Sequence, residues 1–111
     1  MSYIAEVEAE IVSKGLVAPR VTPQDIEAQI AGEYFTTADK AFVDCPILPP
    51  MALLTLCVLV LKNGFTVTGE SACASPENFD EELGRKIARQ HAVNKLWPLL
   101  GYALRDKLHQ G

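Results

Sequence analysis

The sequence predicts an α+β protein with an N-terminal helix, an antiparallel β-hairpin that turns at Asn63-Gly64, and a long C-terminal helix kinked near Pro98. Three observations predict this class. Asn-Gly separates two runs rich in Val, Leu and Thr, which is the strongest short-range hairpin signal. Capping patterns stand before both helical segments. After residue 75, apolar residues recur at helical spacing.

Residues 1–111 have the size and composition of one folded domain. Apolar residues make up 49% and charged residues 22% of the chain, which argues against disorder. Residues 1–22 show no strong period, so we expect a flexible or edge segment there, with Ser2–Val12 as a short strand or a frayed helix. The net charge of −4 argues against general attraction to nucleic acid, although residues 51–111 hold slightly more bases than acids.

The three cysteines predict neither a disulfide framework nor a zinc site, because no C-x-x-C pair is present. Free thiols within apolar runs fit a reducing compartment. Met1–Glu10 is acidic and lacks the apolar core of a signal peptide. The longest apolar run, Met51–Leu61, is interrupted by Thr55 and is far shorter than the roughly 20 residues that a membrane helix needs.

The first clear helix start is Thr22-Pro23-Gln24-Asp25. Thr22 suits the N-cap, Pro23 the first helical position and Asp25 the positive end of the helix dipole. Apolar residues continue at helical spacing to the pair Tyr34-Phe35, which predicts a helix over Pro23–Phe35 and a short helical turn at Thr36–Asp39. The three prolines of Cys45–Pro50 then predict a rigid connector.

The hairpin is predicted to join a strand at Leu54–Leu61 to one beginning at Phe65. A two-residue type I′ turn at Asn63-Gly64 pairs Val60 with Val67, Val58 with Gly69 and Leu56 with Ser71. The first strand is then apolar on both faces, so we expect a helix to cover one face and another subunit or sheet to cover the other. The alternative is a helix over Met51–Lys62 that ends at Gly64.

The last helix is predicted to begin at Ser75-Pro76-Glu77, with Asn78 as an alternative cap. Acids crowd its first turn and bases follow, as the helix dipole favours. Pro98 should kink or restart it. The predicted apolar stripe consists of Phe79, Leu83, Ile87, Val93 and Trp97.

Polar residues at unexpected places are the candidate ligand-binding residues. Gln90 and Asn94 fall within the predicted stripe, so they are either hydrogen-bonded structurally or line a wet pocket. Arg85 and Arg89 lie one turn apart, and such a pair binds either a phosphate or the acids Glu81 and Glu82.

Glu70 and Ser71 complete the candidate set, on opposite faces of the second strand. Catalytic patterns are weak. His91 has no nucleophile at a known spacing, although an enzyme built on Glu70 and His91 stays an alternative. The sequence shows no phosphate loop, metal cluster or cofactor motif, so we predict no cofactor and no metal.

The runs Leu59–Cys73, Asn78-Phe79-Asp80, Gly84–Ala88, Leu96–Leu99 and Gly101-Tyr102 carry a family resemblance. Over about residues 52–108 the chain resembles a family of small tailed-phage proteins named after gene product forty-nine of coliphage N-four and gene sixty-six of phage Sf-six. The motif positions that the resemblance singles out beyond Glu70, Ser71 and Asn94 are expected to be structural: Asn63, Gly64, Asn78, Gly84, Trp97 and Tyr102. Of these, Trp97 and Tyr102 should anchor the core.

The resemblance implies a phage or prophage protein that acts in the host cytoplasm. Our first hypothesis is a homo-oligomeric binding protein that sequesters a nucleotide-like signal molecule or a host protein, in counter-defence or host takeover. The alternatives are a nucleic-acid-binding regulator that uses the bases of the last helix and a small enzyme. No membrane association is expected.

Overall fold

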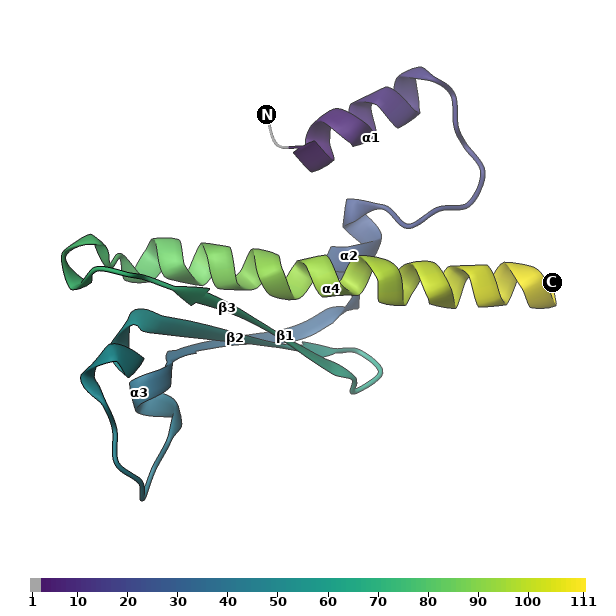
Figure 1. Cartoon of the computed structure of the whole chain (residues 1–111). Helices are drawn as coiled ribbons and strands as arrows, with labels where there is room; N and C mark the ends of the chain where they lie inside the picture. The colour runs from purple at the N-terminus through teal and green to yellow at the C-terminus, as the bar shows by residue number, and fades with distance from the viewer. Residues whose placement is uncertain (1–2) are drawn as a thin grey trace.

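The computed structural model describes residues 3–111 and shows a three-stranded antiparallel sheet with one long helix lying across it (Figure 1). The predicted α+β class is therefore confirmed. The strand order is β1-β2-β3, so β2 is the central strand. The elements are α1 (Tyr3–Ser13), α2 (Pro23–Gln29), β1 (Ile30–Thr37), α3 (Ala38–Ala41), η1 (Pro49–Leu53), β2 (Leu54–Leu61), β3 (Thr66–Ala72), η2 (Pro76–Asn78) and α4 (Glu81–Gln110).

The N-terminal half contains a strand that the sequence did not predict. Thr22 and Asp25 form the expected capping box of α2, but the helix ends at Gln29 instead of Phe35. Residues Ile30–Thr37 instead pair with β2 along its whole length. Tyr34, Phe35 and the two threonines after them favour strand over helix, and seven residue pairs with β2 outweigh the helical spacing. The short turn after Thr37 is confirmed as α3, and residues 3–13 form a helix, not an edge strand.

The hairpin is confirmed, and its register is one residue away from the prediction. Its loop has three residues, because the Gly64 N–H donates to the Leu61 carbonyl (2.9 Å) and the Leu61 N–H donates to the Phe65 carbonyl (2.8 Å). Gly64 takes the left-handed conformation (φ 88°), while Asn63 uses its side chain to accept from the Phe65 N–H (2.9 Å). This is a type I turn followed by a bulge, so the predicted type I′ turn is wrong. The alternative of a helix over Met51–Lys62 is also wrong.

Because the register differs by one residue, Val67 and Gly69 do not share a face with Val60 and Val58, as was predicted, but lie on the opposite face of the sheet. Leu59 pairs with Val67, Cys57 with Gly69 and Thr55 with Ser71. Thr55, Cys57, Leu59 and Leu61 are buried beneath α4 together with Val67 and Gly69. Leu56, Val58 and Val60 therefore share the opposite face with Thr66, Thr68 and Glu70.

Small residues let α4 lie directly on the sheet. Its buried residues are Gly84, Ala88, Ala92, Val93 and Leu96. The predicted apolar stripe is therefore largely wrong: Leu83 and Ile87 are exposed, and only Val93 is fully buried. A Cβ atom at Gly69 would come within 2.1 Å of the Ala88 carbonyl oxygen, so the strand also needs a residue without a side chain there. The helix starts at its N-cap Asp80 and continues through Pro98, so the predicted restart does not occur and Figure 1 shows no sharp kink.

Candidate functional site

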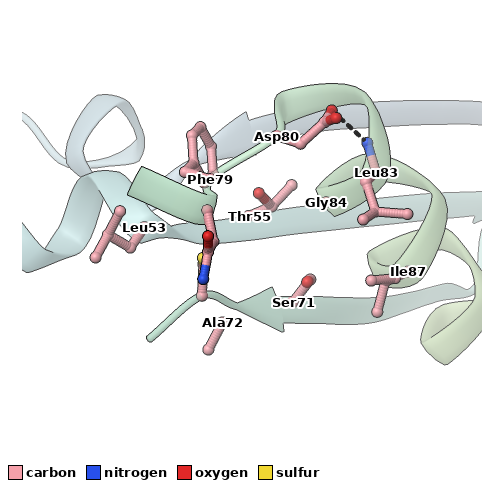
Figure 2. Close-up of a pocket in the computed structure, with 11 residues that line it drawn as sticks. Leu53, Thr55, Ser71, Ala72, Phe79, Asp80, Leu83, Gly84 and Ile87 are labelled. Carbon is pink, nitrogen blue, oxygen red and sulfur yellow. Dashed lines mark hydrogen bonds between the residues drawn. The ribbon is translucent and has the colours of Figure 1, made fainter. Parts of the chain in front are cut away.

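A hollow of about 130 Å³ lies where the N-terminus of α4 meets the ends of β2 and β3 (Figure 2). Three stretches of chain form it: the entry to β2, the exit of β3 and the segment from η2 into α4. Thr55, Ser71, Asn78 and Asp80 contribute the polar side chains of its lining. Leu53, Phe79, Leu83 and Ile87 contribute the apolar side chains. We call this feature the hollow.

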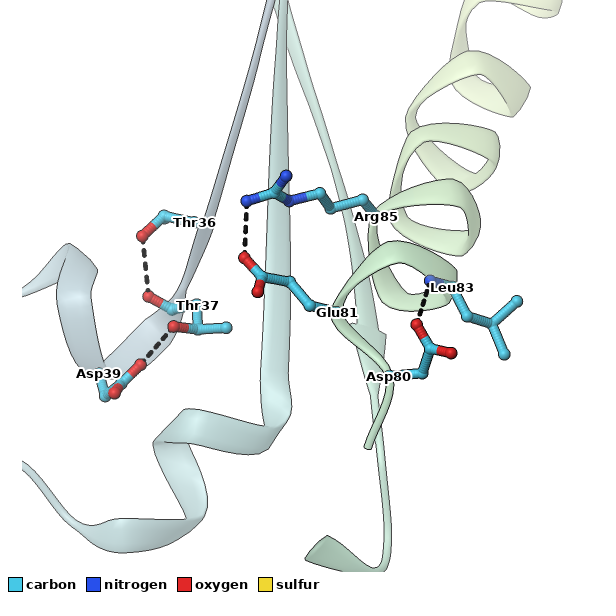
Figure 3. A network of polar contacts seen from close by, with 7 residues as sticks. All are labelled: Thr36, Thr37, Asp39, Asp80, Glu81, Leu83 and Arg85. Atoms are coloured by element: carbon cyan, nitrogen blue, oxygen red, sulfur yellow. Dashed lines mark hydrogen bonds and ion pairs between the residues drawn. The ribbon is translucent and has the colours of Figure 1, made fainter. Parts of the chain in front are cut away.

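Local hydrogen bonds fix the wall of the hollow between β3 and α4. The Cys73 N–H donates to the Leu53 carbonyl (3.0 Å) and extends the β2–β3 ladder, and the Cys73 thiol bonds to the Ser75 carbonyl (3.2 Å). The Asp80 carboxylate accepts from the Leu83 N–H (3.0 Å), which caps α4 (Figures 2 and 3). One backbone bond and two bonds between a side chain and the backbone therefore fix this wall.

Thr55 is the unusual residue of the hollow. It is 2% exposed, and its hydroxyl oxygen has no hydrogen-bond partner within residues 3–111. A buried hydroxyl without a partner costs about 1–3 kcal/mol, so its retention in a strand of Val and Leu needs a reason. Gly84 makes room for it, because a Cβ atom there would come within 2.7 Å of Thr55 Oγ1. Thr55 lies at the centre of the ring of lining residues in Figure 2.

The chemistry of the hollow favours a small group that donates hydrogen bonds. Its carboxylate and hydroxyl oxygens accept hydrogen bonds, and the acids Glu77, Glu81 and Glu82 stand nearby in the sequence of η2 and α4. Negative charge at Asp80 repels phosphate despite the helix dipole. Its volume is well below the roughly 300–1,000 Å³ of sites for drug-sized ligands and is comparable to that of one amino-acid side chain.

Glu70 and Ser71 lie on opposite faces of β3, as the sequence predicted. Ser71 lines the hollow, whereas the Glu70 side chain is exposed on the opposite face of the sheet. Their adjacent positions in one strand require this, since β3 has no bulge between them. Two positions expected to be structural, Asn78 and Gly84, also line the hollow.

The two candidate arginines both have acidic partners inside the chain. Arg85 donates to Glu81 one turn earlier (2.6 Å; Figure 3). Its guanidinium lies 6.0 Å from the centre of the Phe35 ring. Arg89 bonds Glu27 of α2 (2.8 Å) and Glu33 of β1 (2.7 Å). The two glutamates raise the pKa of Arg89, and the Arg89 hydrogen bond lowers the pKa of Glu27. The arginines therefore tie α4 to itself and to its neighbours.

The amides Gln90 and Asn94 pair with each other on the exposed surface of α4. Gln90 Nε2 donates to Asn94 Oδ1 (2.8 Å), and both residues are exposed. The expectation that they fall within a buried stripe is wrong, because the small residues Ala88 and Ala92 face the sheet. Neither amide lines the hollow.

The two residues of the enzyme alternative, His91 and Glu70, are in contact, but His91 contacts the main chain of Glu70 and not its carboxylate. His91 Nδ1 donates to the main-chain oxygen of Glu70 (2.7 Å), since a carbonyl oxygen only accepts. That oxygen points to the open edge of β3, so His91 covers part of an unpaired strand edge. Burial, with the nearby charge of Glu33, raises the pKa of the Cys57 thiol, which keeps this cysteine in its weakly nucleophilic form.

Of the remaining positions that were expected to be structural, three have a structural role and one does not pack against the core. Gly64 supplies the left-handed residue of the turn and Asn63 its side-chain bond, while Trp97 packs half-buried against the core. Tyr102 is 76% exposed, so the expectation that it anchors the core is wrong. Tyr102 belongs to the last ten residues of α4, and the C-terminal end of this helix extends beyond the sheet in Figure 1.

Sequence reasoning missed Thr55 and Asp80 as site residues. The one signal for Thr55 was its position as the polar residue that interrupts an apolar run. Its burial without a partner depends on Gly84, which lies 29 positions later in the chain. No local pattern could show that contact.

A comparison with protein-family models matches residues 21–108 to the Phage protein (N4 Gp49/phage Sf6 gene 66) family. The chain belongs to this family. The match begins well before residue 52, so the phage family includes α2 and β1 as well as the hairpin and α4. No match was found among curated proteins or among solved structures.

Residues 3–111 contain neither a candidate membrane-spanning helix nor a candidate metal site. None of the helices there is both long and apolar enough to cross a membrane. In the same residues, no group of three or more His, Cys, Asp or Glu side chains is placed to hold a metal ion.

Proposed function

We propose that this phage protein works by binding and sequestering a host protein in the host cytoplasm, as part of counter-defence or host takeover. The family supports the phage origin. The observation that carries the binding role is the hollow with its buried, unpartnered Thr55 hydroxyl. A partner side chain that donates a hydrogen bond there offsets a cost that the free protein bears.

The rim of the hollow supports a protein partner. Leu83 is 53% and Ile87 37% exposed at its edge, although both belong to a helix that packs on a sheet. Exposed apolar residues around a polar pocket are typical of a surface that anchors one side chain of a partner. A Lys or Arg side chain fits best, because it donates hydrogen bonds and carries the charge opposite to Asp80.

The nucleotide-like ligand of our first hypothesis has less support than a host protein. Arg85 and Arg89, the expected phosphate contacts, already bind three glutamates between them. The hollow is also too small for a nucleotide and has acidic residues at its edge. Nucleic-acid binding has the same difficulty, since Lys86 faces Glu82 at 3.8 Å.

The test compares capture of host proteins by the full chain and by matched variants. Ile87→Asp places a charge at the rim of the hollow, and Leu99→Asp does so at a similarly exposed residue of the same helix outside it. We expect a host protein that wild type and Leu99→Asp retain and that Ile87→Asp loses. Affinity measured with that purified protein should fall at least about tenfold, the size of one lost anchor contact.

Thr55→Val separates binding from folding. The substitution keeps the shape of the side chain and removes the unpartnered hydroxyl, so the free energy of unfolding should stay the same or rise by about 1 kcal/mol. Partner affinity should nevertheless fall. The same captured proteins for all four chains would refute the proposal. Calorimetric binding of cyclic or linear nucleotides that is insensitive to Ile87→Asp would favour the nucleotide alternative.

A further inference from the structure

The sheet has a second face on the side away from α4, where α3 contacts β1 and β2 and no long helix lies across the strands (Figure 1). α4 lies on one side of the sheet, and α1 and α2 lie on that same side in Figure 1. On the other side Val58 is 36% and Tyr34 63% exposed. We call this surface the open sheet face. Its residues are Tyr34, Thr36, Leu56, Val58, Val60, Thr66, Thr68 and Glu70.

Contact between water and a row of apolar side chains on a central strand is unfavourable in free energy. β2 is hydrogen-bonded on both sides, so its backbone is satisfied and only its side chains can gain from further burial. Leu56, Val58 and Val60 stand on the open sheet face at every second position, with Val58 exposed and Leu56 and Val60 half-buried. The Tyr34 ring lies over Gly32, because a Cβ atom there would meet the ring at 3.1 Å, and this gives the face a flat aromatic edge.

The exposed surface is large for a chain of this mass. The chain exposes 7914 Å², whereas a compact monomer of 12.1 kDa exposes about 6,000 Å². Its radius of gyration is 17.4 Å, against about 13 Å for a compact chain of this length. Part of the excess of roughly 1,900 Å² belongs to α1 and to the end of α4 that extends past the sheet, and the open sheet face contributes to the rest. An interface of standard size buries roughly 800 Å² per subunit.

We infer that the open sheet face binds a second copy of this chain and forms a two-fold dimer of stacked sheets. The face is self-complementary, because an apolar row runs along its middle and threonines flank it on both sides. Glu70 is its one charged residue. A surface so poor in charge has little to attract a partner of opposite charge, and it can pack on its own copy without burying charges.

The register shows why the two copies do not repel each other. Leu56 stands beside Thr36 on one side and Glu70 on the other, so these three residues share one level of the sheet. A two-fold axis along β2 exchanges the positions of β1 and β3. It therefore sets Glu70 of one copy over Thr36 of the other and keeps the two carboxylates apart.

This dimer leaves both hollows accessible, because they open on the α4 side of the sheet. The inference does not depend on the proposed function. Loss of the dimer would leave each hollow intact, and a defect in the hollow would leave the dimer intact. A failed test of the dimer would therefore leave the proposed function untouched, and a failed test of the function would leave the dimer untouched.

The test is the mass of the full chain in solution, measured by light scattering and sedimentation at micromolar concentration. We expect twice 12.1 kDa for wild type. Val58→Lys should give the monomer mass, whereas Leu99→Lys, at a similarly exposed apolar residue on α4, should remain dimeric. Thr68→Lys changes a residue that is already exposed and polar, so it tests the interface without threatening the fold, and we expect the dissociation constant to rise at least tenfold.

Two results would overturn the inference. One is a wild-type chain that stays monomeric throughout the micromolar range. The other is a dimer that neither Val58→Lys nor Thr68→Lys weakens, because such a dimer must use another surface.

Discussion

Three glycines show how much of this protein depends on where a side chain is missing. At Gly69 a Cβ atom would come within 2.4 Å of the Ala92 nitrogen as well as close to the Ala88 oxygen, so strand and helix backbones are almost in contact. At Gly84 the missing side chain leaves room for the Thr55 hydroxyl. At Gly101 a Cβ atom would meet nothing within 4 Å in the described chain. The same residue type thus serves close packing at two positions and has no packing role at the third.

Gly69→Ala and Gly101→Ala should change stability in opposite directions. Gly69→Ala forces α4 away from β3 and should lower the free energy of unfolding by about 3 kcal/mol or more. Gly101→Ala removes a flexible residue from a helix interior and should raise it by about 0.5–1 kcal/mol. Urea unfolding of both variants measures the difference. Equal effects would contradict the close helix–strand contact.

At the scale of elements, Arg89 joins three pieces of secondary structure. Its guanidinium, 30% exposed, reaches from α4 to Glu27 at the end of α2 and to Glu33 in β1. Partial burial and two partners make this a stronger link than the half-exposed pair of Arg85 and Glu81. It holds the unpredicted strand β1 against the helix layer.

This link predicts a dependence of stability on pH. The folded protein lowers the pKa of Glu27 from its ordinary value of 4.5 through the Arg89 hydrogen bond. The stabilisation is therefore fully present above that value and is lost as the pH falls through the lower pKa of the folded state. NMR titration should show the pKa of Glu27 rising toward 4.5 in Arg89→Gln and unchanged in Arg85→Gln. Stability should also decline less steeply with acid in Arg89→Gln, and an unshifted Glu27 in wild type would contradict the link.

At the scale of the whole molecule, the chain is elongated, with dimensions of 52 × 32 × 17 Å. α4 continues past the sheet, and α1 stands apart from the layers in Figure 1. None of the residues 3–13 is buried, and the pair Arg20–Glu8 (2.8 Å) links α1 to the segment that follows it. The core lies between β2, β3 and α4, and Ile26 of α2 is buried in it.

This distribution predicts a gradient in hydrogen exchange. Amides of β2 should exchange slowest, because they are hydrogen-bonded on both sides and lie beneath α4, while α1 should exchange fastest. Exchange followed by mass spectrometry at low protein concentration gives the comparison. If α1 is as protected as β2, then it must pack on a surface that a single chain does not provide.

The sequence by itself determined the features that depend on neighbouring residues. The cap at Thr22, the strand Leu54–Leu61 and the turn at Asn63-Gly64 follow from local φ preferences, capping bonds and apolar runs, which act within a few residues. The family resemblance also came from contiguous motifs and is confirmed over a longer range.

Only the tertiary structure decided the rest. Residues 30–37 became a strand because β2 offered them a ladder of hydrogen bonds. The face of α4 was set by the bare backbone at Gly69, which selects alanines over larger apolar side chains. Thr55 became the centre of a site because Gly84 lies over it. Each outcome depends on contacts between distant residues, and a local pattern carries no information about such contacts.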